Sequence, residues 1–99
     1  MKKTFSTLHP RKAPARVVDT IKHDIRNYVQ RERRKPLPEG FERLEFDCKV
    51  GPNAAAAEVT ALPMMSRMID SVVAGGGTDV YVEILPRPTA RTERGAPRA

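Results

Sequence analysis

The chain has 99 residues, with 18 lysines and arginines against 12 acidic residues, and a single cysteine. This length favours one small domain, no apolar run approaches the ~20 residues that span a bilayer, and the basic start lacks the apolar segment of a secretory signal. The lone cysteine excludes an intramolecular disulfide, so we expect a cytoplasmic protein with no membrane partner.

The first two predicted elements are a short strand and a long helix. Residues 3–8 are rich in β-branched and aromatic side chains, which predicts a strand. Pro14 suits the first turn of a helix, because its missing N–H has no partner there. Pro36 stops this helix just after Lys35. Between them one apolar stripe recurs at helical spacing: Val17, Val18, Ile21, Ile25, Tyr28 and Val29.

The middle of the chain predicts a hairpin. Apolar and charged residues alternate over 41–50, which indicates a strand with one buried face. Gly51-Pro52-Asn53 then has the chemistry of a turn. The alanines after the turn favour helix, but Glu58-Val59-Thr60 alternates, so we predict a return strand over residues 57–61.

A second helix and a last strand complete the pattern. The helix opens at Leu62-Pro63 and ends at Gly75-Gly76-Gly77, since glycine tolerates the left-handed cap conformation. Residues 78–85 alternate and predict the final strand. Pro86-Arg87-Pro88 is expected to end it, and residues 86–99 are predicted to form a disordered basic tail.

The predicted order is β-α-β-β-α-β, which indicates an α+β domain over residues 1–85. This order matches a ferredoxin-like arrangement, an antiparallel sheet with both helices on one face. If residues 3–8 do not pair into the sheet, the fallback is α-β-β-α-β with three strands.

The charges of the chain are sorted into blocks. Residues 1–36 carry eleven lysines and arginines against three acidic residues, whereas residues 37–85 carry three against eight. The last fourteen residues carry four against one. Sorting of this kind suggests that the basic parts meet RNA or another polyanion.

The long helix supplies the candidate binding residues. Lysine and arginine contacts to a phosphate backbone release condensed counterions. We predict eight such contacts: Lys12, Arg16, Lys22, Arg26, Arg31, Arg33, Arg34 and Lys35. The alternative is a solvated surface whose cations favour the negative end of the helix macrodipole.

The other face of the sheet is expected to be acidic. Its predicted residues are Glu45, Asp47, Glu58, Glu83 and Tyr81. Carboxylates repel phosphate, so this face would not bind nucleic acid. It could hold a divalent cation, or it could keep an open sheet from pairing edge to edge. A protein-interaction module or homodimer using this face or a sheet edge is therefore the alternative function.

No constellation of side chains indicates catalysis. Cys48 alternates with apolar residues and is expected to be a buried hydrophobe, which would make its thiol inert. His9, His23 and Cys48 do not have the spacing of a zinc site. We therefore expect a non-enzymatic protein with no cofactor, no bound metal and no small-molecule substrate.

Short strings spread over residues 1–85 carry a resemblance to a known family. They are Met1-Lys2-Lys3-Thr4-Phe5, His9-Pro10, Pro14-Ala15-Arg16, Ile21-Lys22-His23, Arg31-Glu32-Arg33-Arg34-Lys35, Leu37-Pro38-Glu39-Gly40, Phe46-Asp47-Cys48 and Tyr81-Val82-Glu83-Ile84-Leu85. On these strings the chain resembles an uncharacterised family of short bacterial proteins, a domain of unknown function. The resemblance implies a small cytoplasmic bacterial domain and assigns no functional residue.

Overall fold

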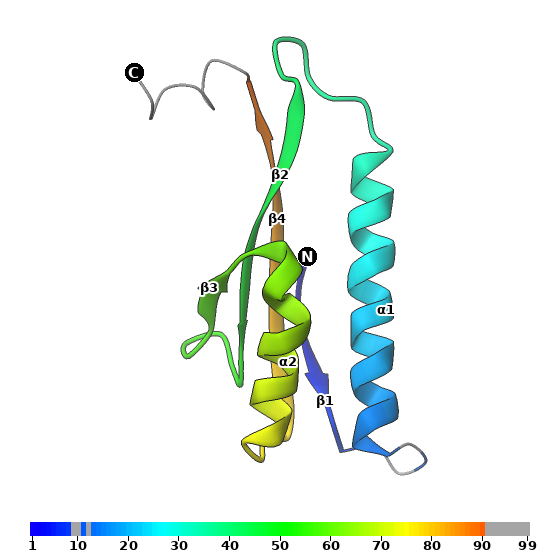
Figure 1. The fold of residues 1–99 in the computed structure, drawn as a ribbon, viewed down its shortest axis with the longest axis vertical. Coiled ribbons are helices and arrows are strands. Elements are labelled where there is room, and N and C mark those ends of the chain that lie inside the picture. The colour runs from blue at the N-terminus through cyan, green and yellow to red at the C-terminus, as the bar shows by residue number, and fades with distance from the viewer. Residues whose placement is uncertain (9–10, 12, 91–99) are drawn as a thin grey trace.

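The computed structural model describes residues 1–8, 11 and 13–90, and within them the elements follow the predicted order. They are β1 (Lys2–Ser6), α1 (Pro14–Arg33), β2 (Arg43–Gly51), β3 (Glu58–Thr60), the 3-10 helix η1 (Leu62–Met64) leading into α2 (Met65–Ala74), and β4 (Asp79–Thr89) (Figure 1). The α+β class is confirmed. The three-stranded fallback is not needed, because β1 pairs with β4.

The strand order is not ferredoxin-like. The four strands are antiparallel neighbours in the order β1-β4-β2-β3, whereas a ferredoxin-like sheet has its first and third strands in the middle. Here β4 and β2 are central. β4 has 11 residues and pairs with β1 and β2 along its two edges, whereas β3 has 3 residues and pairs only with β2.

The final strand extends four residues beyond its expected end at Leu85. The Ile84 N–H donates to the Met1 carbonyl at 2.7 Å, so even-numbered residues of β4 direct their backbone groups toward the β1 side. The backbones of Pro86 and Pro88 face the same side but lie beyond the end of β1. No described strand lies beside them there, so no neighbour requires an N–H donor from these residues. Prolines on a free edge leave the pairing with β2 intact. Residues 86–89 therefore belong to the sheet, and residues 91–99 lie outside the described part of the chain.

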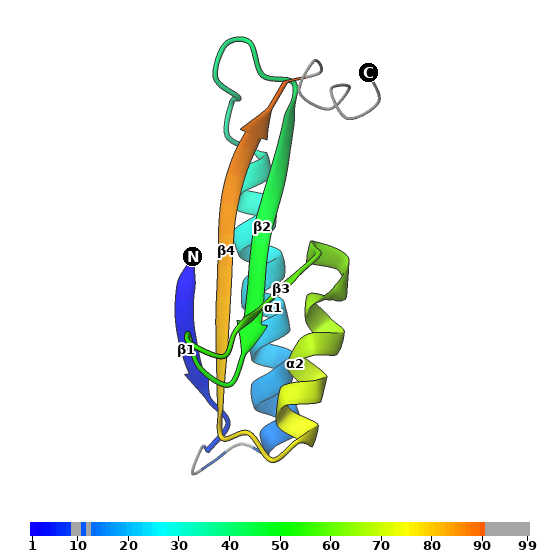
Figure 2. The same ribbon diagram turned by 90° about the vertical axis from the view of Figure 1, so that its left-hand side faces the viewer.

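Both helices cover one face of the sheet, as predicted, and leave the other open (Figure 2). The core between the layers joins Ile21 of α1, Ile69 of α2 and Ile84 of β4, each fully buried. Cys48 belongs to this core and is a free cysteine, 1 % exposed. Burial raises the pKa of its thiol, and the neighbouring Asp47 carboxylate raises it further. The prediction of a buried Cys48 is confirmed.

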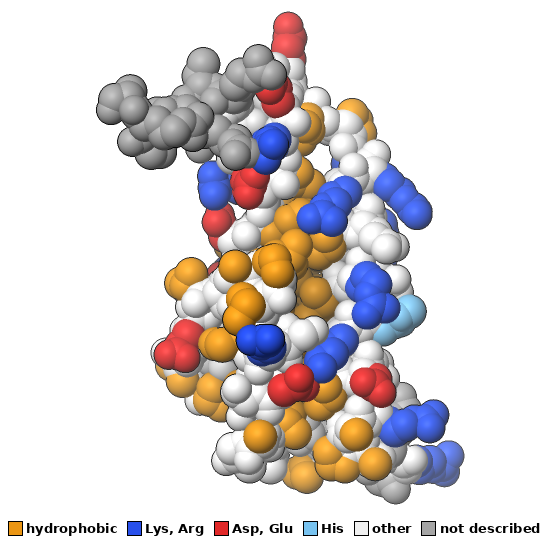
Figure 3. All heavy atoms as spheres, in the orientation of Figure 1, with side chains coloured by type: hydrophobic (Ala, Val, Ile, Leu, Met, Phe, Trp, Pro, Cys, Tyr) orange, Lys and Arg blue, Asp and Glu red, His pale blue; other side chains and the backbone are white. Residues whose placement is uncertain are grey.

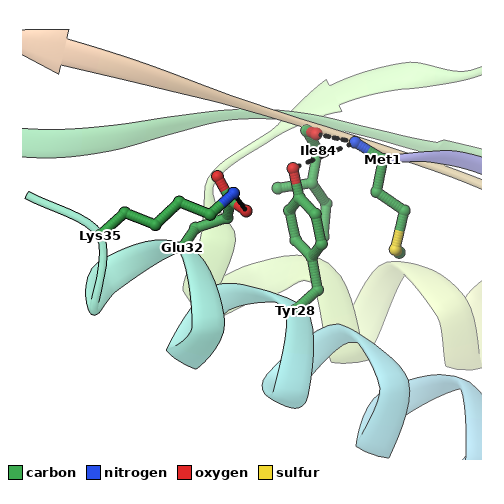
Figure 4. Close-up of polar contacts among 5 residues, drawn as sticks. All are labelled: Met1, Tyr28, Glu32, Lys35 and Ile84. Atoms are coloured by element: carbon green, nitrogen blue, oxygen red, sulfur yellow. Dashed lines mark hydrogen bonds and ion pairs between the residues drawn. The ribbon is translucent and has the colours of Figure 1, made fainter.

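The start of the chain is fastened between the sheet and α1 (Figure 4). The Met1 ammonium donates to the Ile84 carbonyl at 2.6 Å and to the Tyr28 hydroxyl at 3.3 Å. Burial raises the pKa of Tyr28, with a smaller contribution from Glu32. These contacts join the first residue to both the sheet and α1.

Among the helices of the described residues, none has the length and apolar character that crossing a bilayer requires.

Candidate nucleic-acid interface

The eight predicted phosphate contacts lie on α1 and its flanks, and Lys12 lies outside the described residues. α1 begins at Pro14, as predicted, and buries the expected stripe of apolar residues, so its charged side chains stay at the surface or at the borders of the core. Arg31 and Arg33 lie in its last turn, where the helix macrodipole favours positive charge.

Two of the predicted lysines are already engaged with carboxylates. The Lys22 ammonium lies 2.9 Å from Asp70 of α2, and the Lys35 ammonium lies 2.6 Å from Glu32 (Figure 4). Exposed ion pairs of this kind contribute little to stability. They do lower the local positive potential, so these two lysines are weaker candidates than the arginines.

Three arginines keep a free charge. Arg16, Arg26 and Arg34 are exposed, and their side chains form no ion pair or hydrogen bond within the described residues. Arg34 follows Arg16 by eighteen positions, which corresponds to about 27 Å along a helix axis. In Figure 3 lysine and arginine side chains follow α1 from end to end, and acidic side chains gather only near its lower part.

The remaining two arginines lie over aromatic rings. The Arg33 guanidinium carbon is 5.5 Å from the centre of the Phe46 ring, and that of Arg31 is 6.0 Å from the Tyr28 ring. Both residues are exposed. A guanidinium over a ring is held electrostatically while its other groups still face solvent, so both side chains are oriented without being neutralised.

The cations of α1 lie on more than one side of the helix. Arg26 and Arg33 border a hollow between α1 and α2, where Leu62 and Met65 provide apolar walls. Arg31 borders a different hollow, on the β1 side of α1. Arg16 and Arg34 lie between these borders on the outer surface, so the helix presents positive charge over a broad surface.

A further arginine joins this surface from the sheet. Arg43, at the start of β2, lines a hollow of about 460 Å³ together with Arg33 and Leu62. Sequence analysis missed Arg43, because alternation places it on the open face of the sheet but does not show that it lies near the end of α1.

The open face of the sheet is not acidic. Across the central strands Glu45 pairs with Arg87 and Lys49 pairs with Glu83, and Lys2 of β1 lies on the other side of Glu83. The Arg87 guanidinium also lies 3.0 Å from Asp47. Opposite charges side by side stabilise a sheet. The face predicted to be acidic is therefore balanced, because basic residues from other strands alternate with its acids.

Glu58 was also misplaced by the sequence prediction. It pairs with Val50, whose side chain points toward the helices, so it shares the helix side of β2 while Val59 takes the open face. The Tyr81 hydroxyl donates to Glu83 at 2.7 Å, and this bond raises the pKa of Tyr81. No group of three or more histidine, cysteine, aspartate or glutamate side chains within the described residues could hold a metal ion.

Comparison with known proteins places the chain in a family. A family of unknown function, DUF6172, matches residues 1–96. The chain belongs to this family. The resemblance to a domain of unknown function is thus confirmed, and membership in DUF6172 assigns no activity.

One curated protein shares a short similarity with the chain. Altronate dehydratase of Escherichia coli (strain K12) is 32 % identical over 62 residues. The match covers 63 % of this chain but only 12 % of the dehydratase, so it says nothing of a shared activity. No solved structure matches the chain.

Proposed function

We propose that this DUF6172 protein is a non-enzymatic protein that binds the phosphate backbone of nucleic acid, RNA in particular, through the outer surface of α1. The observation that carries the proposal is the free charge of Arg16, Arg26 and Arg34, which no carboxylate of the described residues engages. An arginine that is already paired gains little from a phosphate, whereas an unpaired one releases a counterion from the nucleic acid.

The layout of the chain supports the same surface. β4 ends at Thr89, at the end of the molecule where α1 also ends (Figure 1). The basic residues Arg91, Arg94 and Arg98 follow Thr89 in the sequence. The last basic residues of the N-terminal block, Arg31 to Lys35, and the start of the C-terminal basic block thus belong to the same end of the fold. Positive charge gathered in this way steers a polyanion toward one side of a protein.

Salt dependence is the decisive test. We expect the affinity for a labelled duplex to fall roughly a hundredfold between 50 and 200 mM salt if about four phosphates are contacted. Fluorescence anisotropy measures this directly, with duplex and single-stranded RNA and DNA as probes. Binding whose affinity does not change with salt would refute a phosphate mechanism.

A matched pair of variants locates the surface. Replacing Arg16, Arg26 and Arg34 with glutamine should weaken binding and make the log–log salt slope shallower by about 2.7. Replacing Lys2, Lys49 and Arg67 with glutamine removes the same charge from the open face and from α2. If both variants lose affinity equally, only net charge matters and α1 is not the interface.

The proposal also includes the cellular compartment and the biological source of the protein. We infer a cytoplasmic bacterial protein, because the single cysteine is buried and unpaired and a reducing compartment keeps such thiols free. Fractionation of cells expressing the protein, with blotting of each fraction, tests the compartment.

Protein–protein interaction is the second candidate function. The open face of the sheet does not support an interaction through acidic residues, because that face is balanced in charge. A sheet edge does support an interaction, because β2 is longer than the strand that covers its outer edge.

A further inference from the structure

Half of one edge of β2 has no strand beside it. β2 runs from Arg43 to Gly51, but β3 pairs only with Cys48–Val50. After Thr60 the chain turns away from the sheet into η1. Within the described residues, no strand therefore pairs with Arg43–Asp47 on this side.

The backbone groups of this segment point outward in a regular pattern. Odd-numbered residues of β4 face β2, so Arg43, Glu45 and Asp47 exchange their backbone hydrogen bonds with β4. Because successive residues alternate, Leu44 and Phe46 direct their N–H and C=O groups toward the open edge. The Phe46 carbonyl receives a weak contact from the Cys48 thiol at 3.7 Å.

The opposite edge at the same level is protected. β4 extends beyond β1 there, and its outward-directed positions are Pro86 and Pro88, which have no N–H to offer. Proline on an edge strand discourages pairing with another chain. The edge of β2 carries no proline between Arg43 and Asp47, so the two sides of this ribbon differ in their capacity to accept a strand.

A hollow runs beside the unprotected edge. It measures about 460 Å³, and its walls include the apolar side chains of Leu44, Phe46 and Leu62. Arg33 and Arg43 line it as cations, and Glu45 is its one acidic lining residue. The hollow therefore offers strand-spaced hydrogen-bonding groups, an apolar wall and an excess of positive charge.

We propose that the edge of β2 binds an extended acidic peptide of another protein, which adds a strand in line with β3. Main-chain hydrogen bonds give affinity in this mode, and alternate side chains give specificity. Apolar side chains of the peptide would lie beside Leu44 and Phe46, and an acidic side chain would lie beside Arg43. This proposal goes beyond nucleic-acid binding and does not depend on it.

Charge argues against the chain's own tail as the occupant. Residues 91–99 carry three arginines and one glutamate, and Arg33 and Arg43 repel such a segment. The match between two arginines and an acidic strand is the reason for committing to a partner of that chemistry.

The test uses a short peptide as the probe. Acetyl-Thr-Val-Thr-Val-Glu-Glu-Ser-amide, run antiparallel to β2, places its valines opposite Phe46 and Leu44. We expect it to shift the amide NMR signals of Leu44 and Phe46 in the full chain. N-methylation of both valines removes the donors that face β2 and should weaken binding roughly 5- to 150-fold. N-methylation of both threonines alters only donors that face away, so binding should be retained.

Two protein variants test the same geometry from the other side. Leu44→Pro removes one outward N–H without taking a hydrogen bond from β4, and should weaken binding of the peptide roughly 2- to 13-fold. Arg43→Glu reverses the charge of one side chain that lines the hollow and should weaken binding of the peptide roughly tenfold. If Leu44→Pro does not melt cooperatively, the N-methylated peptides and Arg43→Glu decide the question.

Several results would overturn the proposal. An absence of amide shifts at millimolar peptide would overturn it. Equal losses of affinity on N-methylating the valines and on N-methylating the threonines would also overturn it. Sedimentation of the free protein as a dimer that Leu44→Pro abolishes would assign the edge to a second copy. Shifts of the same two amides by an oligonucleotide, with competition against the peptide, would assign it to nucleic acid.

Discussion

The open face of the sheet and the outer surface of α1 carry similar numbers of cations but arrange them differently. On the sheet, acid and base alternate across neighbouring strands, as in the row Lys2, Glu83 and Lys49. On α1, Arg16, Arg26 and Arg34 form no ion pair with a carboxylate of the described residues. The first arrangement uses charge to hold a sheet together, and the second leaves charge available to a partner.

The largest effect on stability is expected at Glu83, which lies between Lys2 and Lys49 on the open face of the sheet. Glu83→Lys would place three cations side by side on adjacent strands, where like charges are destabilising. We expect the free energy of unfolding to fall by about 1–2 kcal/mol, from the loss of two favourable pairs and the gain of repulsion. Urea denaturation measures it, with Glu83→Gln as the uncharged control. Equal stability of the two variants would show that the row contributes no electrostatic energy.

A crossed pair of double variants compares the two regions directly. Lys2→Gln with Lys49→Gln removes both partners of Glu83 and should destabilise the protein by roughly 0.4–2 kcal/mol. Arg16→Gln with Arg26→Gln removes the same charge from α1 and should change stability by less than about 0.5 kcal/mol. Thermal melts of both proteins in the same buffer test this. The comparison fails if the α1 variant is the less stable one.

A smaller effect is expected where β2 and β4 extend beyond their shorter neighbours. Arg87→Ala removes the ion pair with Asp47, and both side chains are about half exposed. We expect a loss of about 0.2–1 kcal/mol, which added salt reduces in the wild type. Asp47→Ala should give a smaller loss, because Arg87 also lies opposite Glu45, and the double variant should lose little more than Arg87→Ala alone. Additive losses would mean that the two residues act independently.

The pH dependence of Tyr81 is the smallest expected effect. Its hydrogen bond to Glu83 raises the pKa of the folded protein above the ordinary tyrosine value. This stabilisation is complete below the unfolded pKa of about 10. As the pH rises above this value, Tyr81 loses its proton in the unfolded chain before it does so in the folded protein. The free energy of unfolding therefore falls with pH until the pKa of Tyr81 in the folded protein is passed. Ultraviolet titration should show a lower Tyr81 pKa in Glu83→Gln, and an unchanged value would exclude Glu83 as the cause.

Sequence patterns predicted the elements because each depends on neighbours in the chain. Pro14 begins α1, the stripe from Val17 to Val29 is buried, and Cys48 faces the core between its alternating neighbours. These results follow from helical and strand periodicity, which the order of residues contains. The predicted end of β4 was wrong, because a proline ends a strand only where its missing N–H is needed by a neighbour.

The candidate site was predicted only in part. Periodicity correctly placed Arg16, Arg26 and Arg34 at the surface, but it could not show that Asp70, 48 residues away, engages Lys22. It also gave no sign that Arg43 and Arg33 share a hollow. Contacts between residues far apart in sequence depend on how elements pack, and no local pattern encodes them.

The sequence by itself determined the order of helices and strands, the buried sides of β2 and β4 and the arginine-rich outer surface of α1, since these follow from the spacing of residue types along one segment. The tertiary structure alone decided the strand order, the register and the partners of each charge. Register places Arg87 beside Glu45 and Lys2 beside Glu83, which turns an apparently acidic face into a balanced one. The same pairing, by stopping β3 at Thr60, leaves the edge of β2 open. Both outcomes depend on which strands become neighbours, and that is settled by the burial of the whole core.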